Sequence, residues 1–421
     1  MNKTKTVLFV MPRLPFPASS GRKTSLYHYC RILSKELGYR LIVAAFLENG
    51  DDPSKKPGFI DELIILPKPN AIKKMNSIFI NSFILKKLPM QVALYWNPKA
   101  KKIIDEIYAK EKPEIVIGDM VRSTEYIRKY DTFTIADLDD RISLRYQRQL
   151  ENDIDGINPY GAFLDTVPRL LRKLLLIKSV KLSVVKNEIK LLNKYELEIG
   201  AVCNATVFVA QKEADEFNNE LGIKKAFAVP IGVDTDYFSY RKCGIDGNVI
   251  GFLGALNVAH NENAVRHFII DIFPDIIKKV PDTKFLVIGG GASAELLALQ
   301  NKNIIFTGRV DDVREFLERC KIFVCPMTFG SGIKTKNLEA MAMGLPVVTT
   351  TVGAENISAR NNYEWKVADS EKFADNVIDL IKDNELCLTM GKKGSEFVSK
   401  NYTWYITKEC LSSLLEGLQK Q

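Results

Sequence analysis

The chain has 421 residues, of which 46% are hydrophobic and 26% charged, so it is long enough for two globular domains that each bury their own core. This balance excludes an intrinsically disordered or fibrous chain. The formal net charge of +8 suits anionic partners such as membranes, nucleic acids or phosphorylated ligands, and charge alone does not choose among them.

The seven cysteines are scattered and show no CxxC or other metal-ligand spacing. With three histidines in the whole chain, the sequence argues against a histidine-rich metal site. We therefore expect reduced thiols in a cytoplasmic protein. No apolar run approaches the roughly 18 residues that span a bilayer. The basic, proline-interrupted start of the chain is expected to form a first strand and not a signal peptide.

The first half alternates apolar strands with helical runs, as parallel α/β sheets do. The run from Thr6 to Val10 is the expected first strand, and the loop after it carries Ser19, Ser20 and Gly21 before a helix from about 24 to 37. Further strands are predicted at 41–46, 62–66, 114–117, 133–136 and 205–210, and further helices at 99–110, 163–199 and 211–219.

Two segments of this half combine apolar and basic residues. Residues 71–96 place four lysines beside Ile and Phe side chains, and the helix expected at 163–199 begins with an apolar and basic half. Such a composition suits helices that lie on a membrane surface near anionic lipid headgroups. The alternative is a set of amphipathic helices packed on their own domain with solvated lysines.

Acidic residues follow the strand predicted at 133–136. Asp137, Asp139, Asp140 and Arg141 stand where a parallel strand ends, and reactive groups in such sheets gather at the carboxyl ends of strands. One of these aspartates is a candidate general base for an acceptor hydroxyl. The alternative is an acidic helix cap.

The second half restarts the pattern after a crossover near 228–240. Strands are predicted at 249–253, 283–288, 304–307, 322–325 and 345–350, and the final helices at 370–383 and 385–420. We therefore divide the chain into domains at 1–240 and 241–400. The last helix, near 400–421, is expected to pack back on the first domain.

One glycine-rich loop organises the second half. Gly330 and Gly332 precede Lys334 and Lys336, and a helical run that contains Glu339 follows. Backbone N–H groups at such a helix start, together with the lysines, form a candidate diphosphate cradle. Glu339 is a carboxylate early in that helix, where it can accept hydrogen bonds from two ribose hydroxyls. The alternative is a tight strand-to-helix turn with solvated lysines.

The stretch LEAMAMGLPVVTT, from Leu338 to Thr350, resembles the donor-site motif of glycosyltransferase family 4. The crossover passage PIGVDTDYF is similar to the family's PNGVD-x-x-x-F, and a subgroup of bacterial exopolysaccharide sugar transferases carries a similar GSGIK loop. Three departures stand out: Ser331 replaces the leading glutamate, the strand end at 137 lacks the family's histidine, and an asparagine-containing loop at 257–263 replaces an Arg and a Lys.

The resemblance implies an α/β chain of the GT-B fold, with two Rossmann-like doubly wound domains that face an interdomain cleft. It further implies a retaining, metal-independent sugar transfer, with a UDP- or GDP-linked donor in the second domain and a glycan or lipid-linked acceptor on the first. The candidate catalytic residues are Asp137 and Asp140, from their place at a strand end, together with Lys334. The implied donor contacts are Gly21, Arg22, Gly254, Gly290, Arg309, Val310, Gly330, Ser331, Gly332, Ile333, Lys334, Lys336 and Glu339.

Bottom-up reasoning leaves Gly21 and Arg22 open, because they also fit a prolyl turn and a helix cap. The favoured function is a sugar transferase of surface polysaccharide assembly, cytoplasmic and peripheral at the inner face of the membrane. The alternative is a catalytically impaired protein that binds sugar nucleotides. A nucleic-acid binder is the third hypothesis, but no recognition module is legible, so we expect no nucleic-acid partner and no resident cofactor or metal.

Overall fold

The computed structural model describes residues 5–18, 21–48, 50–152, 172–173, 175–241, 247–330, 332–369 and 372–420. The chain divides into two compact units: Met1–Pro230 with Lys408–Gln421, and Ile231–Thr407. The break after residue 230 lies ten residues before the boundary predicted from the crossover motif, and the last residues of the chain fall in the first unit.

The first unit is built on a seven-stranded parallel sheet with the order β3-β2-β1-β4-β5-β6-β7. Its central strands are almost wholly buried, which is why they are continuous apolar runs in the sequence. The strands are β1 (Thr6–Met11), β2 (Arg40–Ala45), β3 (Glu62–Ile65), β4 (Ile115–Asp119), β5 (Phe133–Asp139), β6 (Ala205–Phe208) and β7 (Ala226–Ala228).

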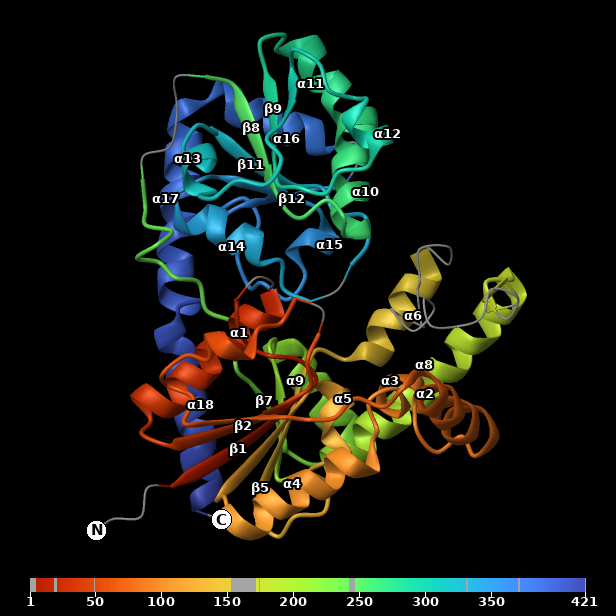
Figure 1. Ribbon diagram of the computed structural model, residues 1–421. Coiled ribbons are helices and arrows are strands. Elements are labelled where there is room, and N and C mark those ends of the chain that lie inside the picture. Colours follow the sequence, from red (N-terminus) through yellow and green to blue (C-terminus); the bar gives the residue numbers. More distant parts are fainter. Residues whose placement is uncertain are drawn as a thin grey trace. The chain divides into compact units, whose positions relative to one another are not determined.

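Helices connect these strands (Figure 1). The α-helices are α1 (Gly21–Arg31), α2 (Ala71–Ile78), α3 (Met90–Ala93), α4 (Pro98–Glu111), α5 (Met120–Thr124), α6 (Ile142–Asn152), α8 (Lys178–Val202) and α9 (Gln211–Leu221), and η2 (Pro53–Lys55) is a short 3-10 helix. Two segments are π-helices: η1 (Ile32–Glu36) and η3 (Phe79–Ile84). The last helix of the chain, α18 (Trp404–Gln419), contributes its residues from 408 onward to this unit.

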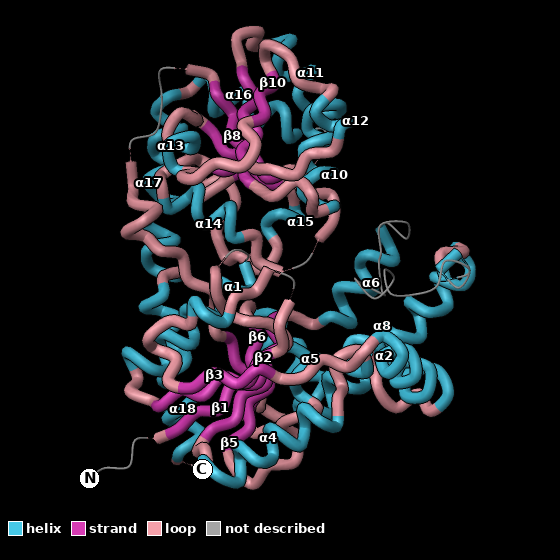
Figure 2. Tube along the Cα trace, viewed as in Figure 1, coloured by secondary structure: helices cyan, strands magenta, loops and turns pink. Residues whose placement is uncertain are grey.

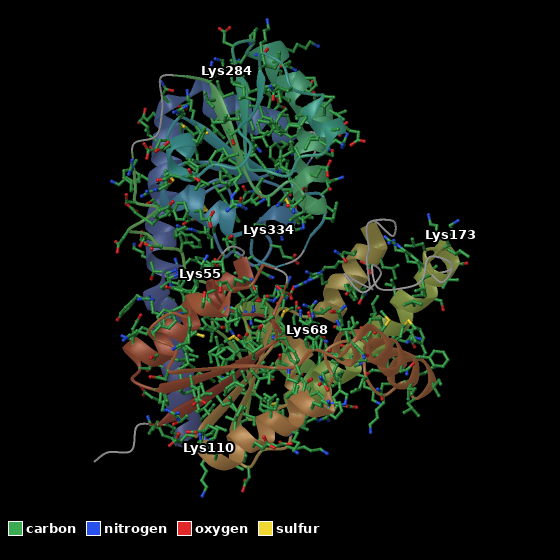
Figure 3. The ribbon with its side chains drawn as sticks, viewed as in Figure 1. Lys55, Lys68, Lys110, Lys173, Lys284 and Lys334 are labelled. Atoms are coloured by element: carbon green, nitrogen blue, oxygen red, sulfur yellow. The ribbon has the colours of Figure 1, made fainter. Side chains whose placement is uncertain are left out.

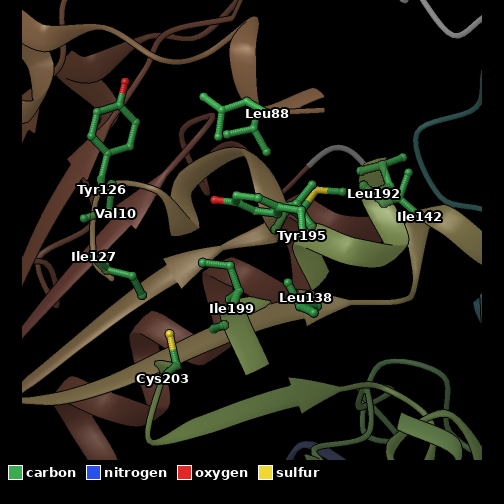
Figure 4. Packing of buried hydrophobic residues seen from close by; sticks show 14 of the residues in the cluster. Val10, Leu88, Tyr126, Ile127, Leu138, Ile142, Leu192, Tyr195, Ile199 and Cys203 are labelled. Carbon is green, nitrogen blue, oxygen red and sulfur yellow. The ribbon is translucent and has the colours of Figure 1, made fainter. Parts of the chain in front are cut away.

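A single hydrophobic core joins the sheet of the first unit to α5 and α8. Figure 4 shows part of it, where Val10 and Leu138 of the sheet lie in one cluster with Tyr195 and Ile199 of α8. The Tyr195 hydroxyl is fully enclosed and donates a hydrogen bond of 2.9 Å to Oε2 of Glu125. Burying a large apolar side chain such as that of Leu138 or Ile199 stabilises the fold by about 1.5–3 kcal/mol.

The second unit repeats the plan with a six-stranded parallel sheet (Figure 2), in the order β10-β9-β8-β11-β12-β13. Its strands are β8 (Val249–Leu253), β9 (Lys284–Ile288), β10 (Ile304–Phe306), β11 (Ile322–Cys325), β12 (Val347–Thr349) and β13 (Lys366–Val367). Its helices are α10 (Ala259–His267), η5 (Phe268–Ile272), α11 (Phe273–Lys279), α12 (Ala294–Leu297), α13 (Arg314–Leu317), α14 (Thr335–Ala342), α15 (Thr351–Ala354), α16 (Phe373–Lys382) and α17 (Asn384–Asn401).

Both sheets therefore have the doubly wound order in which the first strand of the unit lies in the middle. The chain runs outward from β1 to β3 and then returns to β4, and in the second unit it runs from β8 to β10 and returns to β11. At such a switch point the loops after the two central strands diverge, and ligands bind outside the carboxyl ends there. The predicted pair of Rossmann-like sheets is confirmed.

Two helix predictions need correction. The helix expected at 163–199 is described from residue 178 and extends to 202 as α8, because Cys203 turns the chain toward β6 only there. Residues 163–171 and 174 lie outside the described residues. The segment 71–96 is not one amphipathic pair but α2, η3 and α3, interrupted by Lys86, whose φ of 47° ends the helical path.

Within the described part of the chain, no helix is both long and apolar enough to cross a membrane. The cysteines described there are all free thiols, and five of the six are buried.

Close backbone packing holds α14 in place. Gly391 of α17 lies so near the end of α14 that a Cβ at this position would be 2.0 Å from the carbonyl oxygen of Gly344. Backbone atoms have little freedom to move away, so glycine is required here by the approach of the two segments and not by a special φ.

We expect Gly391→Ala to destabilise the protein by about 1–3 kcal/mol, because the added methyl group forces α17 away from Gly344. The measurement is thermal unfolding followed by circular dichroism. Gly417→Ala is the matched control, since a Cβ there meets nothing within 4 Å, and we expect it to be neutral or to stabilise by up to about 1 kcal/mol. Equal losses in both variants would contradict the packing argument.

Candidate functional site

The switch point of the second unit lies between β8 and β11, which pair directly. The loop after β11 turns through two glycines in the left-handed region, Gly330 (φ 134°) and Gly332 (φ 70°), before α14 begins. The N-cap position of α14 is Lys334, and no side chain of a described residue caps that end. The amide of Asn337 donates to the carbonyl of Lys334 at 2.9 Å, and a helix start without a side-chain cap favours an anion. Anion binding at this position stays a prediction.

Lys336 is on α14, after β11, and its side chain reaches the residues that follow β8. Its Nζ donates a hydrogen bond of 2.6 Å to Oδ1 of Asn261 and sits 4.5 Å from the centroid of the Phe252 ring. Burial lowers the pKa of this ammonium group below its usual value. The amine is therefore a pre-positioned donor that has already lost part of its water, and this favours an anionic ligand beside it.

Gly254, which follows β8, makes room for Lys336. A Cβ on Gly254 would lie 2.8 Å from Lys336 Nζ and 3.0 Å from Asn261 Nδ2, and that Nδ2 donates to the carbonyl of Ala255 at 2.9 Å. Sequence reasoning noted the asparagines after β8 but did not predict that Asn261 holds Lys336. The feature of the sequence that indicates this contact is the position of Asn261 in the first turn of α10, where its amide faces the loop after β8.

Lys334 is buried, and its Nζ donates a hydrogen bond of 2.7 Å to the carbonyl of Gly332 in its own loop (Figure 3). The ammonium group thus closes the glycine turn that precedes α14. Gly330 and Ile333 are half-buried in the same turn, while Ser331 lies outside the described residues. Four of the predicted donor-site residues therefore lie together in this turn: Gly330, Gly332, Ile333 and Lys334.

Glu339 lies one turn after Lys336 on α14 and is half-buried. Its carboxylate accepts no hydrogen bond from any described side chain or backbone group, whereas its neighbours Leu338 and Ala340 are fully buried. Burial raises the pKa of Glu339 to about 7, against the opposing charge of Lys336. A partly accessible carboxylate without a hydrogen-bond donor is suited to bind hydroxyl groups of a ligand.

The carboxyl ends of β8, β9 and β10 meet at one edge of the sheet. A Cβ on Gly289 (φ 142°) would lie 2.0 Å from the carbonyl oxygen of Gly254, and Gly289 also bridges to Gly308. A Cβ on Gly290 would lie 3.2 Å from that of Arg309, whose side chain is exposed. The predicted residues Gly254, Gly290, Arg309 and Val310 are thus brought to this one edge.

The predicted residues of the first unit form a separate ionic cluster at its own switch point. Arg22, at the start of α1, donates through Nη2 to Asp119 Oδ1 (2.5 Å) and Asp137 Oδ2 (2.7 Å), and through Nη1 to Asp139 Oδ1 (3.0 Å). Asp119 ends β4, and the other two aspartates end β5. We name Arg22, Asp119, Asp137 and Asp139 the Arg22 cluster.

Burial governs the charges of this cluster. It raises the pKa of Asp137 to about 7, although Arg22 opposes that shift, and it raises the pKa of Asp139 as well. Burial disfavours the charged guanidinium too, but the three carboxylates outweigh it and raise the pKa of Arg22. Two buried oxygens, Asp119 Oδ2 and Asp137 Oδ1, have no hydrogen-bond partner among the described residues.

Several predicted roles in the first unit do not match this geometry. The guanidinium of Arg22 neutralises carboxylates instead of standing open to a phosphate, and Gly21 is an exposed first residue of α1 with no steric need for glycine. Asp140 is 4% exposed and ion-paired with Arg145, which donates to it at 2.9 Å. Asp137 is 2% exposed. Neither aspartate is placed to reach an acceptor hydroxyl, so the general base stays a prediction that this geometry does not favour.

Among the described residues, no three His, Cys, Asp or Glu side chains are arranged to hold a metal ion. The sequence predicted no role for Arg145 or for the buried Asn337 of α14. The amide of Asn337 donates to the carbonyl of Gly353 at 2.9 Å and so ties α14 to the turn after β12.

Comparison with known proteins agrees with this arrangement. Residues 247–383 match the family model described as glycosyl transferases group 1. The chain is 22% identical over 422 residues to an uncharacterized 44.6 kDa protein in the cps region of Klebsiella pneumoniae, covering 97% of this chain and 99% of that protein. It is 29% identical over 192 residues to the capsular polysaccharide biosynthesis glycosyltransferase CapM of Staphylococcus aureus, covering 43% of this chain and 49% of CapM.

The structure of Anabaena Alr3699/HepE in complex with UDP and glucose superposes with a TM-score of 0.65 at 12% identity, covering 98% of this chain and all of that one. The narrower resemblance to family 4 and its exopolysaccharide subgroup stays a prediction. Residues 247–383 match the model of the group 1 glycosyl transferases, and the chain has the two Rossmann-like sheets of the GT-B fold.

Proposed function

We propose that the protein transfers a sugar from a nucleotide-diphosphate donor, bound by the second unit, to a glycan or lipid-linked acceptor in the assembly of a surface polysaccharide. The observation that carries the proposal is Glu339, a half-buried carboxylate without a hydrogen-bond donor, one turn from Lys336 on a helix whose N-terminus is uncapped. This arrangement offers one group for ribose hydroxyls and another for phosphates.

The names of the relatives support the pathway, since one lies in a cps region and another acts in capsular polysaccharide biosynthesis. A UDP-linked donor is supported by the likeness to a protein solved with UDP and glucose, and a GDP-linked donor remains the other prediction. In the proposed reaction the leaving diphosphate gains negative charge. Lys336, Lys334 and the start of α14 stabilise that charge without a metal, and the anomeric configuration is retained.

A second candidate is a protein that binds sugar nucleotides without transferring the sugar. It is favoured by the burial of Asp137 and Asp140, the two aspartates predicted to be catalytic. Turnover separates the two functions, because both bind the donor and only the transferase releases nucleoside diphosphate.

Turnover is tested by incubating the protein with UDP- and GDP-sugars and a membrane extract, and by measuring the release of UDP or GDP. We expect Glu339→Ala to lower kcat/KM by about 10²-fold or more, because the ribose loses its carboxylate partner. Glu396→Ala, an exposed glutamate of α17 in the same unit, is the control and should keep full activity. Donor binding without any release would instead support the non-transferring protein.

The protonation of Glu339 gives a second test. Only the ionised carboxylate of Glu339 accepts hydrogen bonds through both oxygens from the two ribose hydroxyls. Its pKa in the free protein is raised to about 7. We expect affinity for the donor to rise with pH through about 7 and to be about tenfold weaker at about pH 6 than at about pH 8, since the competent fraction falls accordingly. Isothermal titration with an intact nucleotide sugar, whose phosphates do not titrate in this range, measures the profile.

Glu339→Gln should bind more weakly at about pH 8 and lose this pH dependence. Glu396→Gln should keep the wild-type profile. A profile that is unchanged in Glu339→Gln would show that another group titrates.

Arg22 acts in this proposal as a positioning residue, because it joins the ends of β4 and β5 to the start of α1. Asp139 (φ 68°) and Met120 (φ 54°) adopt left-handed backbone conformations beside it, which cost free energy for residues with a side chain. The ion pairs of Arg22 hold these strand ends in shape, and the strand ends form the edge at which an acceptor would bind.

We expect Arg22→Met to destabilise the protein by about 3–5 kcal/mol at about pH 8, because the buried carboxylates of Asp119 and Asp137 then lose the guanidinium that pairs with them. Without Arg22 the folded-state pKa values of Asp137 and Asp139 rise further, so protonation favours the folded variant and the loss shrinks as the pH falls toward about 5. Urea unfolding across this pH range measures both effects. Arg31→Met is the control on the same helix, where the half-exposed pair with Glu36 is worth about 1 kcal/mol or less.

A further inference from the structure

We propose that an apolar ridge on the first unit docks on the surface of an anionic lipid bilayer. The ridge consists of Phe79, Ile80, Phe83, Ile84 and Leu85, which form η3 and its C-cap. This inference rests on the proposed function only in that a lipid-linked acceptor would lie on the same bilayer, and the surface is argued independently of the donor site.

The ridge is unusually exposed for side chains of this kind. Phe79 is 61% exposed, Ile84 60% and Leu85 58%, while Ile80 and Phe83 are 47% and 36% exposed. Five large apolar side chains within seven residues make a contiguous patch and not scattered surface residues. A patch of this kind on a protein surface marks an interaction site.

The polarity of η3 is reversed relative to a helix that packs on its own domain. Ser82 is the buried side chain of this segment at 0% exposed, and its Oγ has no hydrogen-bond partner among the described residues. A helix that faces water buries its Phe and Ile side chains and exposes its serine. Here the serine faces inward and the apolar side chains face outward, as in a helix whose outer face meets lipid.

The backbone of the ridge is held in place, so its exposure is not the result of an unattached segment. Nδ2 of Asn187 on α8 donates to the carbonyl of Ser82 at 3.5 Å. The amides of Lys87 and Leu88 donate to the carbonyl of Asn81 at 2.7 and 3.2 Å. The π-helical form of η3 lets one more residue project in this turn, and such insertions are frequent at functional sites.

The stretch of sequence that contains the ridge carries charged side chains of one sign. Residues 63–104 contain no Asp or Glu and eight lysines, of which Lys86 and Lys87 follow the ridge directly and are exposed. Lysines that flank apolar side chains attract anionic headgroups while the apolar side chains enter the boundary with the acyl chains. A water-soluble partner protein needs no such continuous positive stretch.

A second segment shares this character. Residues 166–187 also lack Asp and Glu. Just before α8, Leu176 (49%) and Ile177 (48%) are exposed next to the exposed Arg172 and Lys173. Figure 1 shows α2 beside α8, and the Asn187 contact with Ser82 joins α8 to η3. The partner that fits both segments is therefore a bilayer with negative headgroups.

The test is flotation of the full-length protein with vesicles of phosphatidylcholine alone or with about one third phosphatidylglycerol, at low and high salt. We expect binding to the anionic vesicles that weakens with salt. Phe79→Ser/Ile84→Ser should weaken it by about tenfold or more, because two side chains no longer enter the boundary. Lys86→Gln/Lys87→Gln should reduce the preference for anionic lipid.

Ile223→Ser/Lys224→Gln is the matched control, because it removes an exposed apolar residue and an adjacent exposed lysine elsewhere on the same unit. It should bind like the wild type. All variants should keep their melting temperature and their affinity for nucleotide sugar, which separates this proposal from the proposed function. Equal binding to neutral and anionic vesicles, unaltered binding by the ridge variants, or a ridge that instead mediates self-association in size-exclusion chromatography would overturn it.

Discussion

One close approach between two strand ends shapes the carboxyl edge of the sheet in the second unit. The carbonyl oxygen of Gly254 occupies the space that a Cβ on Gly289 would fill, at 2.0 Å. Glycine at both positions lets the loops after β8 and β9 meet without a side chain between them. Gly254 also leaves space for the Nζ of Lys336. The same contact therefore positions both the ammonium group of Lys336 and the start of the turn that contains Gly290.

The two units share a strand order but differ in what stands at the switch point. In the second unit an ammonium group and an unpaired carboxylate are partly accessible, whereas in the first unit Arg22 is enclosed by three carboxylates. Three negative charges, two of them buried, against one positive charge are costly. The raised pKa of Asp137 relieves part of that cost, since a proton taken up near neutral pH replaces a missing cation. The first switch point therefore maintains structure, and the second is suited to bind a ligand.

The sequence predicted the sheets well because parallel strands buried on both faces are continuous apolar runs, as in β1 and β11. It also predicted α14, because a strong helical run lies between glycines. It did not predict the partners of charged side chains. Asn261 and Lys336 are 75 residues apart, and Arg22 meets aspartates about a hundred residues away. Local patterns carry no information on such contacts, which follow only from the strand order.

For the ridge, too, the sequence alone did not determine which way the side chains face. Hydrophobic periodicity in residues 71–96 is compatible with a helix packed inward or outward, because the pattern of apolar residues is the same in both cases. Burial decides between them. Ser82 is turned inward and Phe79 and Ile84 are turned outward, which excludes a helix that packs its apolar face on its own domain. An outward apolar face costs free energy in water in proportion to its area. That cost is removed when another apolar surface covers the face, and the absence of acidic residues from 63 to 104 is the reason for proposing an anionic lipid surface.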